Sequence, residues 1–290
     1  MTPLLTAARH RLEYAVFLAI GRIFGAMPVE RASAVSGFGW RVIAPLTSRH
    51  RRATAHLRRA FPEKTARECD AIARAMWENL GRTFGEFFHL DEIAASDRLI
   101  VEDPNGTLAG ISPDRGFIAC AAHQGNWEIA VMGLSYRAVG VAGLYQRVKN
   151  PLVDALVRRK REKFYPGGLF EKRPASALRL MRHARDGGGV AILSDLRERK
   201  GLPAPFFGAP APSTPFPATL ARTLDVPLFA ATMVREPGVR FRLRLDPVEV
   251  PRTADRDDDI ARATARIHAA FEASIRRRPE QWMWAHRRWG

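Results

Sequence analysis

The sequence predicts an α/β fold in which a central, mostly parallel sheet is flanked by helices and preceded by a helical N-terminal cap. Short continuous apolar runs follow residue 106, helical stretches separate these runs, and the first hundred residues carry apolar side chains at helical spacing. The chain has 290 residues, of which 46% are hydrophobic and 26% charged, so it can bury a substantial core. A disordered tail and a disulfide-stapled miniprotein are thereby excluded.

The first hundred residues are expected to be helical. Apolar side chains recur at helical spacing in the first segment, at Leu12, Val16, Phe17, Ile20, Ile23 and Phe24. A further helix is predicted to begin after Thr65, whose hydroxyl would cap it with Glu68 as its partner in a capping box. One face of that helix carries Ile72, Met76, Leu80 and Phe84.

Residues 12–29 form a mostly apolar segment interrupted by Glu13, Arg22 and Pro28. A spanning helix needs roughly 20 predominantly apolar residues, and a charge near its centre is costly. No signal-peptide cleavage pattern follows the segment. We therefore expect an amphipathic or shallowly inserted helix; the alternative is a soluble helix docked on the core. The arginines available for lipid phosphates are Arg9, Arg11, Arg22 and Arg31.

Beyond Gly106 the chain alternates between predicted strands and helices. The strands are expected at residues 116–122, 139–145, 189–193 and 226–234, and the helices at 127–139, 151–163 and 176–185. This alternation predicts parallel strands joined by right-handed crossovers. Residues 241–245 and 248–250 are expected to be edge strands, residues 202–217 an apolar loop rich in Pro and Gly, and residues 257–278 a last helix. Residues 1–100 would form the cap and residues 101–290 the α/β core, together as one structural unit.

The chain is strongly basic, and the excess is concentrated near its start. Forty-six Lys and Arg face thirty Asp and Glu, a net charge of +16, and residues 1–60 hold ten arginines against only Glu13 and Glu30. The preferred partner is therefore expected to be anionic: nucleic acid, an acidic membrane surface or an acidic protein. Cys69 and Cys120 lie in no CxxC or Cys/His cluster, which favours a reducing compartment and argues against a structural zinc site.

The segment from Ala122 to Glu128, AHQGNWE, is the most informative for chemistry. His123 follows a predicted buried strand and so lies at the carboxyl edge of the sheet, where open α/β folds place their sites. Glu128 follows five residues later across a strand–turn–helix junction, which can bring its carboxylate to the imidazole and make His123 a general base. The alternative is a histidine that only satisfies the turn.

Several further segments form a pattern together with His123-x4-Glu128. They are Asn150-Pro151-Leu152-Val153-Asp154 with Arg161, Ser194-Asp195 followed by Lys200-Gly201, Pro205-Phe206-Phe207-Gly208, Thr214, and residues 279–289. Taken together, these segments resemble the late lipid A acyltransferases, the lauroyl/myristoyl family within the HX4(D/E) glycerolipid acyltransferase superfamily. The resemblance covers nearly the whole chain. Leu196 departs from the pattern, because the family usually has Gln after this Asp.

The resemblance implies transfer of a fatty acyl chain from acyl carrier protein to a hydroxyl of a lipid A precursor, with no metal, no other cofactor and no covalent acyl-enzyme. It implies an enzyme at the cytoplasmic face of the bacterial inner membrane, peripheral or anchored by its N-terminal helix. His123 would be the base and Glu128 would hold its imidazole. Arg161 would contact an oxyanion or phosphate, unless it belongs only to a solvated charge run. Asp195 would order a loop or cap a turn, and Asn126 would shape the turn.

The expected partners are acyl carrier protein, an anionic lipid acceptor and a membrane surface, but no nucleic acid. Two alternatives stay open: an acyltransferase for a lysophospholipid, an ornithine lipid or a glycosylated phosphatidylinositol, and a non-enzymatic basic protein that binds membranes or nucleic acid. Against the last, no RNA-binding motif, helix-turn-helix or zinc-finger spacing occurs in the sequence.

Overall fold

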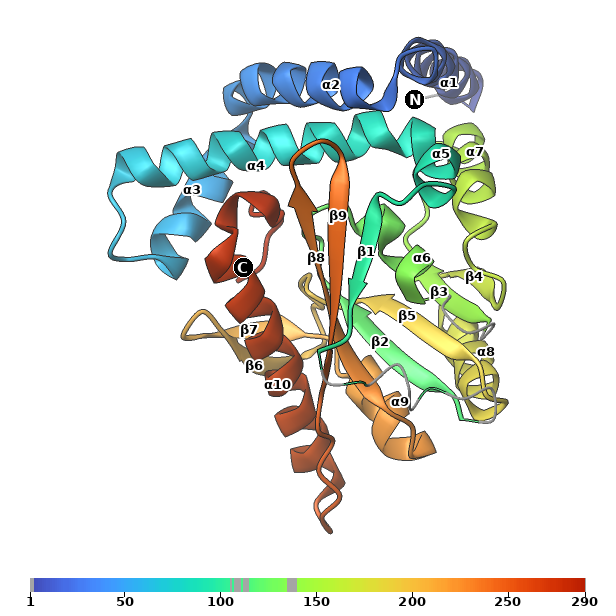
Figure 1. Ribbon diagram of the computed structural model, residues 1–290, viewed down its shortest axis with the longest axis vertical. Coiled ribbons are helices and arrows are strands. Elements are labelled where there is room, and N and C mark those ends of the chain that lie inside the picture. Colours follow the sequence, from blue (N-terminus) through green and yellow to red (C-terminus); the bar gives the residue numbers. More distant parts are fainter. Residues whose placement is uncertain (1–2, 105, 107–110, 112–114, 135–139, 290) are drawn as a thin grey trace.

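The protein contains a central, mostly parallel sheet with helices on both faces (Figure 1), as expected from the sequence, and this sheet has seven strands among the described residues. The computed structural model describes residues 3–104, 106, 111, 115–134 and 140–289. The strand order is β1-β9-β8-β2-β5-β3-β4, and neighbours are parallel except for β8 and β9. The strands are β1 Leu99–Glu102, β2 Phe117–Ala121, β3 Val141–Tyr145, β4 Gly168–Glu171, β5 Gly189–Leu193, β8 Leu228–Glu236 and β9 Arg240–Pro247.

The helices divide between the two faces of the sheet and one end of its strands (Figure 1). Their bounds are α1 Pro3–Gly25, α2 Val29–Ile43, α3 Ser48–Ala60, α4 Ala66–Glu86, α5 Leu90–Ala94, α6 Ala130–Leu134, α7 Pro151–Glu162, α8 Pro174–Arg185, α9 Phe216–Leu224 and α10 Arg256–Arg277. Ile118 and Cys120 of β2 face one core cluster, whereas Phe117, Ala119 and Ala121 face the other. Burial on both faces explains why β2 is apolar at every position.

Helix α4 lies across the end of the sheet where the turn at residues 122–128 follows β2, and α2 packs directly on α4 (Figure 1). Thr65 and Glu68 form the predicted capping box at its start. Gly81 and Gly85 allow the two helices to approach closely, since a Cβ at these positions would lie 2.6 Å from the Ser36 carbonyl oxygen and 2.5 Å from that of Ala32. Helix α2 is thus fixed to α4, the helix that covers the turn at residues 122–128.

Residues 202–217 were expected to be a loop, and this prediction was wrong: β6 Leu202–Phe206 and β7 Ala209–Ser213 form a β-hairpin. Pro203 faces Pro212 and Pro205 faces Pro210. Because proline has no N–H, the facing prolines can occupy only the non-hydrogen-bonded pairs of the ladder, and the residues between them make the bonds. The hairpin turns at Phe207 and Gly208, both at positive φ (50° and 70°).

Three other expectations need correction. Residues 241–245 belong to β9, which lies between β1 and β8 rather than at an edge, and residues 248–250 are not a strand. The edges are β1 and β4, which the sequence did not reveal because each is only four residues long and half-buried. The helix expected at 127–139 is a 3₁₀ turn, η4 Trp127–Ile129, followed by α6; the remainder of that prediction, residues 135–139, lies outside the described residues.

Cys69 and Cys120 are both free and buried. Across the part of the chain that the structure describes, no three His, Cys, Asp or Glu side chains group together as metal ligands. No described helix has the length and apolar character needed to cross a bilayer.

Candidate active site

A cavity of about 850 Å³ opens at the carboxyl ends of the central strands. His123, Trp127, Glu128 and Arg161 all line it, so the structure brings these residues to one place. Asp195 lies directly beneath His123, fully buried. The apolar part of the wall is formed by Val131, Leu134, Leu144, Tyr165, Leu169 and Leu193.

His123 and Asp195 are joined by two hydrogen bonds. Asp195 Oδ1 lies 2.7 Å from His123 Nδ1, and Asp195 Oδ2 accepts the His123 backbone N–H at 2.8 Å. The sheet register explains the pairing, because β2 and β5 are parallel neighbours in which Ala121 faces Leu193. Two residues beyond each strand, His123 and Asp195 therefore stand side by side.

The imidazole partner is thus Asp195, and the expectation that Glu128 would hold the His123 ring is corrected. Asn126 caps η4 by accepting the Glu128 N–H, and the Glu128 side chain reaches α7 instead. There its two oxygens accept from Arg161, with distances of 2.7 Å to Nε and 2.5 Å to Nη2. Both residues of the sequence signature line the cavity, but each has a different partner: His123 pairs with Asp195 and Glu128 pairs with Arg161.

The surroundings of Asp195 keep it ionised. Burial alone would raise its pKa, but the charge of His123, the two hydrogen bonds from that residue and a third from the Trp282 indole N–H lower the pKa below its usual value. A carboxylate on Nδ1 fixes the imidazole tautomer and leaves Nε2 as the basic nitrogen. Since His123 lines the cavity, Nε2 is the atom available to a bound hydroxyl.

Arg161 is held rigidly by its carboxylate partner. Burial by itself would lower its pKa, but the Glu128 charge and hydrogen bonds raise the pKa instead, so the guanidinium stays protonated. Its charge is therefore matched by Glu128 rather than free for a ligand. A guanidinium has five N–H groups, and two are used by Glu128, which leaves donors for an atom in the cavity.

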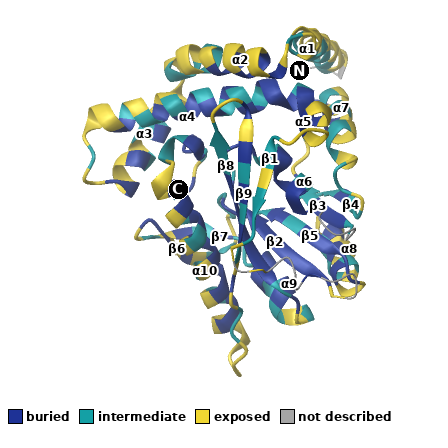
Figure 2. Ribbon diagram, in the orientation of Figure 1, coloured by how far each residue is buried: buried dark blue, intermediate teal, exposed yellow. Residues whose placement is uncertain are grey.

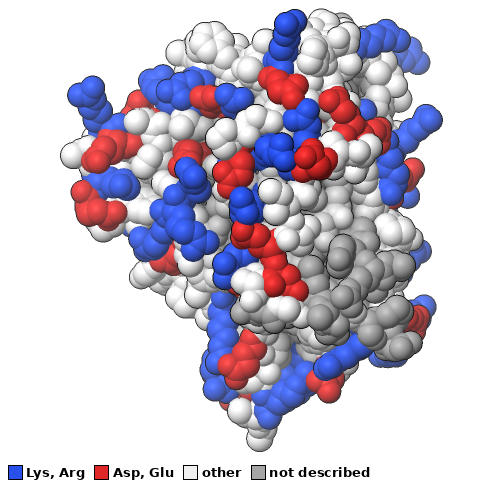
Figure 3. Space-filling model, in the orientation of Figure 1, with Lys and Arg blue, Asp and Glu red and all other residues white. Residues whose placement is uncertain are grey.

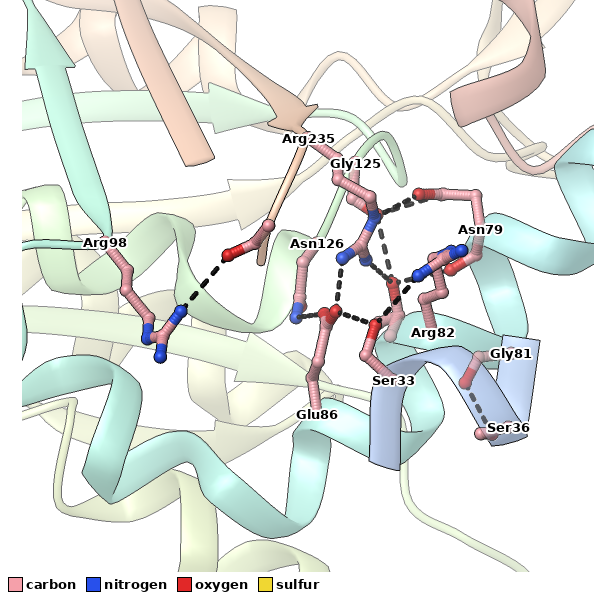
Figure 4. Close-up of polar contacts among 12 residues, drawn as sticks. Ser33, Ser36, Asn79, Gly81, Arg82, Glu86, Arg98, Gly125, Asn126 and Arg235 are labelled. Atoms are coloured by element: carbon pink, nitrogen blue, oxygen red, sulfur yellow. Dashed lines mark hydrogen bonds and ion pairs between the residues drawn. The ribbon is translucent and has the colours of Figure 1, made fainter. Parts of the chain in front are cut away.

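A buried polar network fixes the turn that carries these residues (Figure 4). Asn126 donates from Nδ2 to Glu86 at 2.8 Å, and Glu86 also accepts from Ser33 and Arg235. Gly125 has φ 60°, and a Cβ there would lie 2.6 Å from the Met233 carbonyl oxygen, so only glycine fits.

The Gly125 carbonyl oxygen accepts from two side chains of α4, Asn79 at 3.0 Å and Thr83 at 3.1 Å. Side chains of α4 therefore hold the turn at two points, the Gly125 carbonyl group and, through Glu86, the Asn126 side chain (Figure 4). Sequence reasoning missed Glu86 and Arg235, because each is an isolated charge with no motif around it. Only their shared burial reveals that they belong to the site.

Replacing Glu86 by Gln is expected to destabilise the protein by about 3–5 kcal/mol, because it leaves the nearly buried Arg235 guanidinium without its counter-charge. The measurement is the free energy of unfolding in urea. Glu78→Gln on the same helix is the matched control: Glu78 pairs with Arg41 and Arg82 near the surface, where the loss should be about 0–1 kcal/mol. Equal losses in the free energy of unfolding for the two variants would show that the buried network stabilises the protein no more than a surface ion pair does.

Comparison with known proteins places the whole chain in one group. Residues 2–290 match the family model for bacterial lipid A biosynthesis acyltransferases. A search of curated proteins finds no significant match. The family match spans the N-terminal helices, the sheet and the C-terminal segment alike, and it agrees with the resemblance carried by the sequence motifs. The chain therefore belongs to the bacterial lipid A biosynthesis acyltransferase family.

Proposed function

We propose that the protein transfers a fatty acyl chain from acyl carrier protein to a hydroxyl group of a lipid A precursor, at the cytoplasmic face of the bacterial inner membrane. The observation that carries this proposal is the His123–Asp195 pair, whose imidazole lines a cavity with an extensive apolar wall. Such a pair activates a hydroxyl group, and such a wall accommodates a hydrocarbon chain.

In the proposed reaction, His123 Nε2 takes the proton from the acceptor hydroxyl as its oxygen attacks the thioester carbonyl carbon. Asp195 stabilises the imidazolium that forms. The tetrahedral intermediate then collapses, the carbon–sulfur bond breaks, and the leaving thiolate takes the proton from His123. The acyl group passes directly between the two substrates, so the proposal needs no acyl-enzyme, metal or further cofactor; acylated carrier protein is a co-substrate.

Glu128, Arg161 and Asn126 have supporting roles in this proposal. Glu128 orients Arg161, whose remaining N–H groups are directed to the oxyanion of the tetrahedral intermediate. Asn126 holds the turn between His123 and Glu128. Positioned donors stabilise a developing oxyanion strongly in a site that excludes water.

The N-terminal helices support the membrane part of the proposal. Phe17 and Phe24 of α1 pack on Phe84 and Phe88, so one face of α1 is docked on the core. The outer face of α1, with α2 and the turn that follows it, is exposed and apolar (Figure 2). We call it the apolar outer face; its large exposed side chains are Leu4, Leu5, Leu12, Val16, Ile23, Val35, Phe38, Val42, Ile43 and Leu46.

Uncharged side chains dominate the same region in Figure 3, with basic side chains at its margins. Among the described residues, the exposed large hydrophobic side chains outside the apolar outer face are only Ile100, Leu152 and Leu178. Arg9, Arg11, Arg22 and Arg31 are exposed beside it, and each basic residue near an anionic membrane surface contributes about 1 kcal/mol to binding. An apolar surface bordered by arginines fits an anionic lipid bilayer.

Replacing Phe38, Ile43 and Leu46 together by Ser is expected to weaken binding to vesicles containing phosphatidylglycerol by at least about ten-fold, because these side chains can no longer enter the bilayer. Co-sedimentation with the vesicles measures the effect. Leu178→Ser is the control, since Leu178 is 59% exposed on α8, away from the apolar outer face. Unchanged binding by the triple variant would place the membrane contact elsewhere.

The experiment that tests the function uses purified protein, carrier protein loaded with lauroyl to stearoyl chains, and a Kdo-bearing lipid A precursor. A mass gain of one acyl group on the precursor would support donor, acceptor and reaction together. Absence of product with every donor would discard this acceptor, and lysophospholipids and ornithine lipids would be offered next.

A further inference from the structure

Arg197 is a cation of the cavity wall that forms no ion pair with any of the residues that the structure describes. The other basic residues of the wall are paired: Arg161 with Glu128, Lys172 with Glu198 at 2.7 Å, and Arg173 with Glu171 at 2.7 Å. Within the described ranges, the Arg197 Nε atom is buried and has no hydrogen-bond partner. A buried donor of this kind costs free energy unless a ligand satisfies it.

The fold places further positive charge around Arg197. Arg197 follows Asp195 by two residues on the loop after β5, and Lys172 and Arg173 connect β4 to α8 in the same cavity wall. Lys172 reaches across to Glu198, the neighbour of Arg197, so the two loops are in contact. Helix α8 begins beside them with no acidic residue in its first turn and no side-chain cap, which adds the positive end of its dipole.

The opposing charges do not cancel this excess. Glu198 is the acidic residue of the wall on this side, and Glu171 pairs with Arg173 just outside it. Both of these ion pairs involve basic side chains that are more than half exposed, and exposed pairs contribute only about 0–1 kcal/mol. Lys172 and Arg173 can therefore turn toward an anion at little cost, whereas Arg161 is held by two short bonds.

We propose that Arg197, assisted by Lys172 and Arg173, binds a phosphate group of a substrate in the cavity that His123 lines. A guanidinium matches phosphate oxygens in a planar, bidentate geometry, and the charge of Arg197, unlike that of Arg161, is not already compensated by a carboxylate among the described residues. This inference rests on the proposed function, under which two substrates carry phosphate: the lipid A precursor on its sugars and the carrier protein in its phosphopantetheine arm. The resemblance implies an oxyanion or phosphate contact for Arg161; in this proposal Arg161 serves the oxyanion and Arg197 the phosphate.

The test compares Arg197→Gln with wild type in steady-state acyl transfer. The acceptor is supplied with and without its phosphates, and the donor as acyl-phosphopantetheine or acyl-pantetheine. We expect Arg197→Gln to raise the KM for one phosphorylated substrate by about 10- to 100-fold and to leave the KM for its dephosphorylated form unchanged. The substrate that shows this pattern is the source of the phosphate. Arg199→Gln is the matched control, because Arg199 is exposed and does not line the cavity.

A binding measurement separates this inference from the proposed function. Calorimetric titrations of the whole protein use a glucosamine disaccharide bisphosphate and its dephosphorylated form, then phosphopantetheine and pantetheine. A phosphate preference in either pair that Arg197→Gln abolishes supports the site, even if the wild-type protein acylates no acceptor offered. No preference in either pair, or a preference that survives in Arg197→Gln, overturns the site whether or not acyl transfer occurs.

Discussion

His123→Ala is expected to lower kcat for acyl transfer by about 10²–10⁴-fold, the usual contribution of a positioned general base. The variant lacks the atom that takes the hydroxyl proton, while the apolar wall and Arg161 remain in place. The KM values of both substrates should therefore change little. Turnover measured with the purified protein and carrier-protein donor gives both quantities.

The fold should survive this substitution, because Asp195 keeps two donors, the backbone N–H of residue 123 and the Trp282 indole. Far-UV circular dichroism and the urea midpoint check this point. His286→Ala is the matched control, since His286 is another histidine of the same cavity wall and makes no hydrogen bond to Asp195. Turnover of the His123 variant at the wild-type rate would remove the proposed mechanism.

Asp195→Asn is expected to reduce kcat on the order of 10²–10⁴-fold, although the two side chains have the same shape. Asp195 Oδ2 accepts from the His123 backbone N–H and the Trp282 indole, so an Asn would place its oxygen there and its NH2 group toward His123 Nδ1. That ring nitrogen must then accept, and the proton moves to Nε2. A protonated Nε2 cannot take a proton from a hydroxyl, as in the tautomer argument for serine-protease triads.

The tautomer can be read directly from the ¹⁵N shifts of His123, which a merely structural role of Asp195 would not alter. Trp282→Phe is the control: it removes one hydrogen bond to Asp195 but not the one to the imidazole. A normal kcat together with an unchanged tautomer in Asp195→Asn would contradict the assignment.

The free energy of unfolding should also depend on the ionisation of Asp195. The pKa of Asp195 is lowered in the folded protein, so its ionised form contributes stability above the unfolded value of about 4, and this contribution is lost as the pH falls through the folded pKa. The stability difference between wild type and Asp195→Asn should therefore shrink as the pH falls below about 4.

Elements that are buried on both faces could be predicted from the sequence, and elements at the edges could not. The continuous apolar runs of β2 and β5 are a local property, because both faces of these strands are covered by helices. The hairpin of β6 and β7 could not be predicted, because its strands depend on a pairing that is not a local property of the sequence. Its alternating prolines suggest a loop, and only the pairing of one proline with another allows a ladder.

By itself, the sequence determined the family, the α/β class and the position of His123 at the end of a strand, since these follow from local patterns and from motifs. Only the tertiary structure decided which carboxylate serves which partner. His123 and Asp195 are 72 residues apart, and the register of β2 against β5 joins them, whereas Asn126 directs Glu128 to Arg161 on α7. That Arg197 forms no ion pair within the described part of the chain is evident only once the neighbouring pairs, Lys172–Glu198 and Arg173–Glu171, are known. Burial and pairing are properties of the folded packing, and residue spacing along the chain does not encode them.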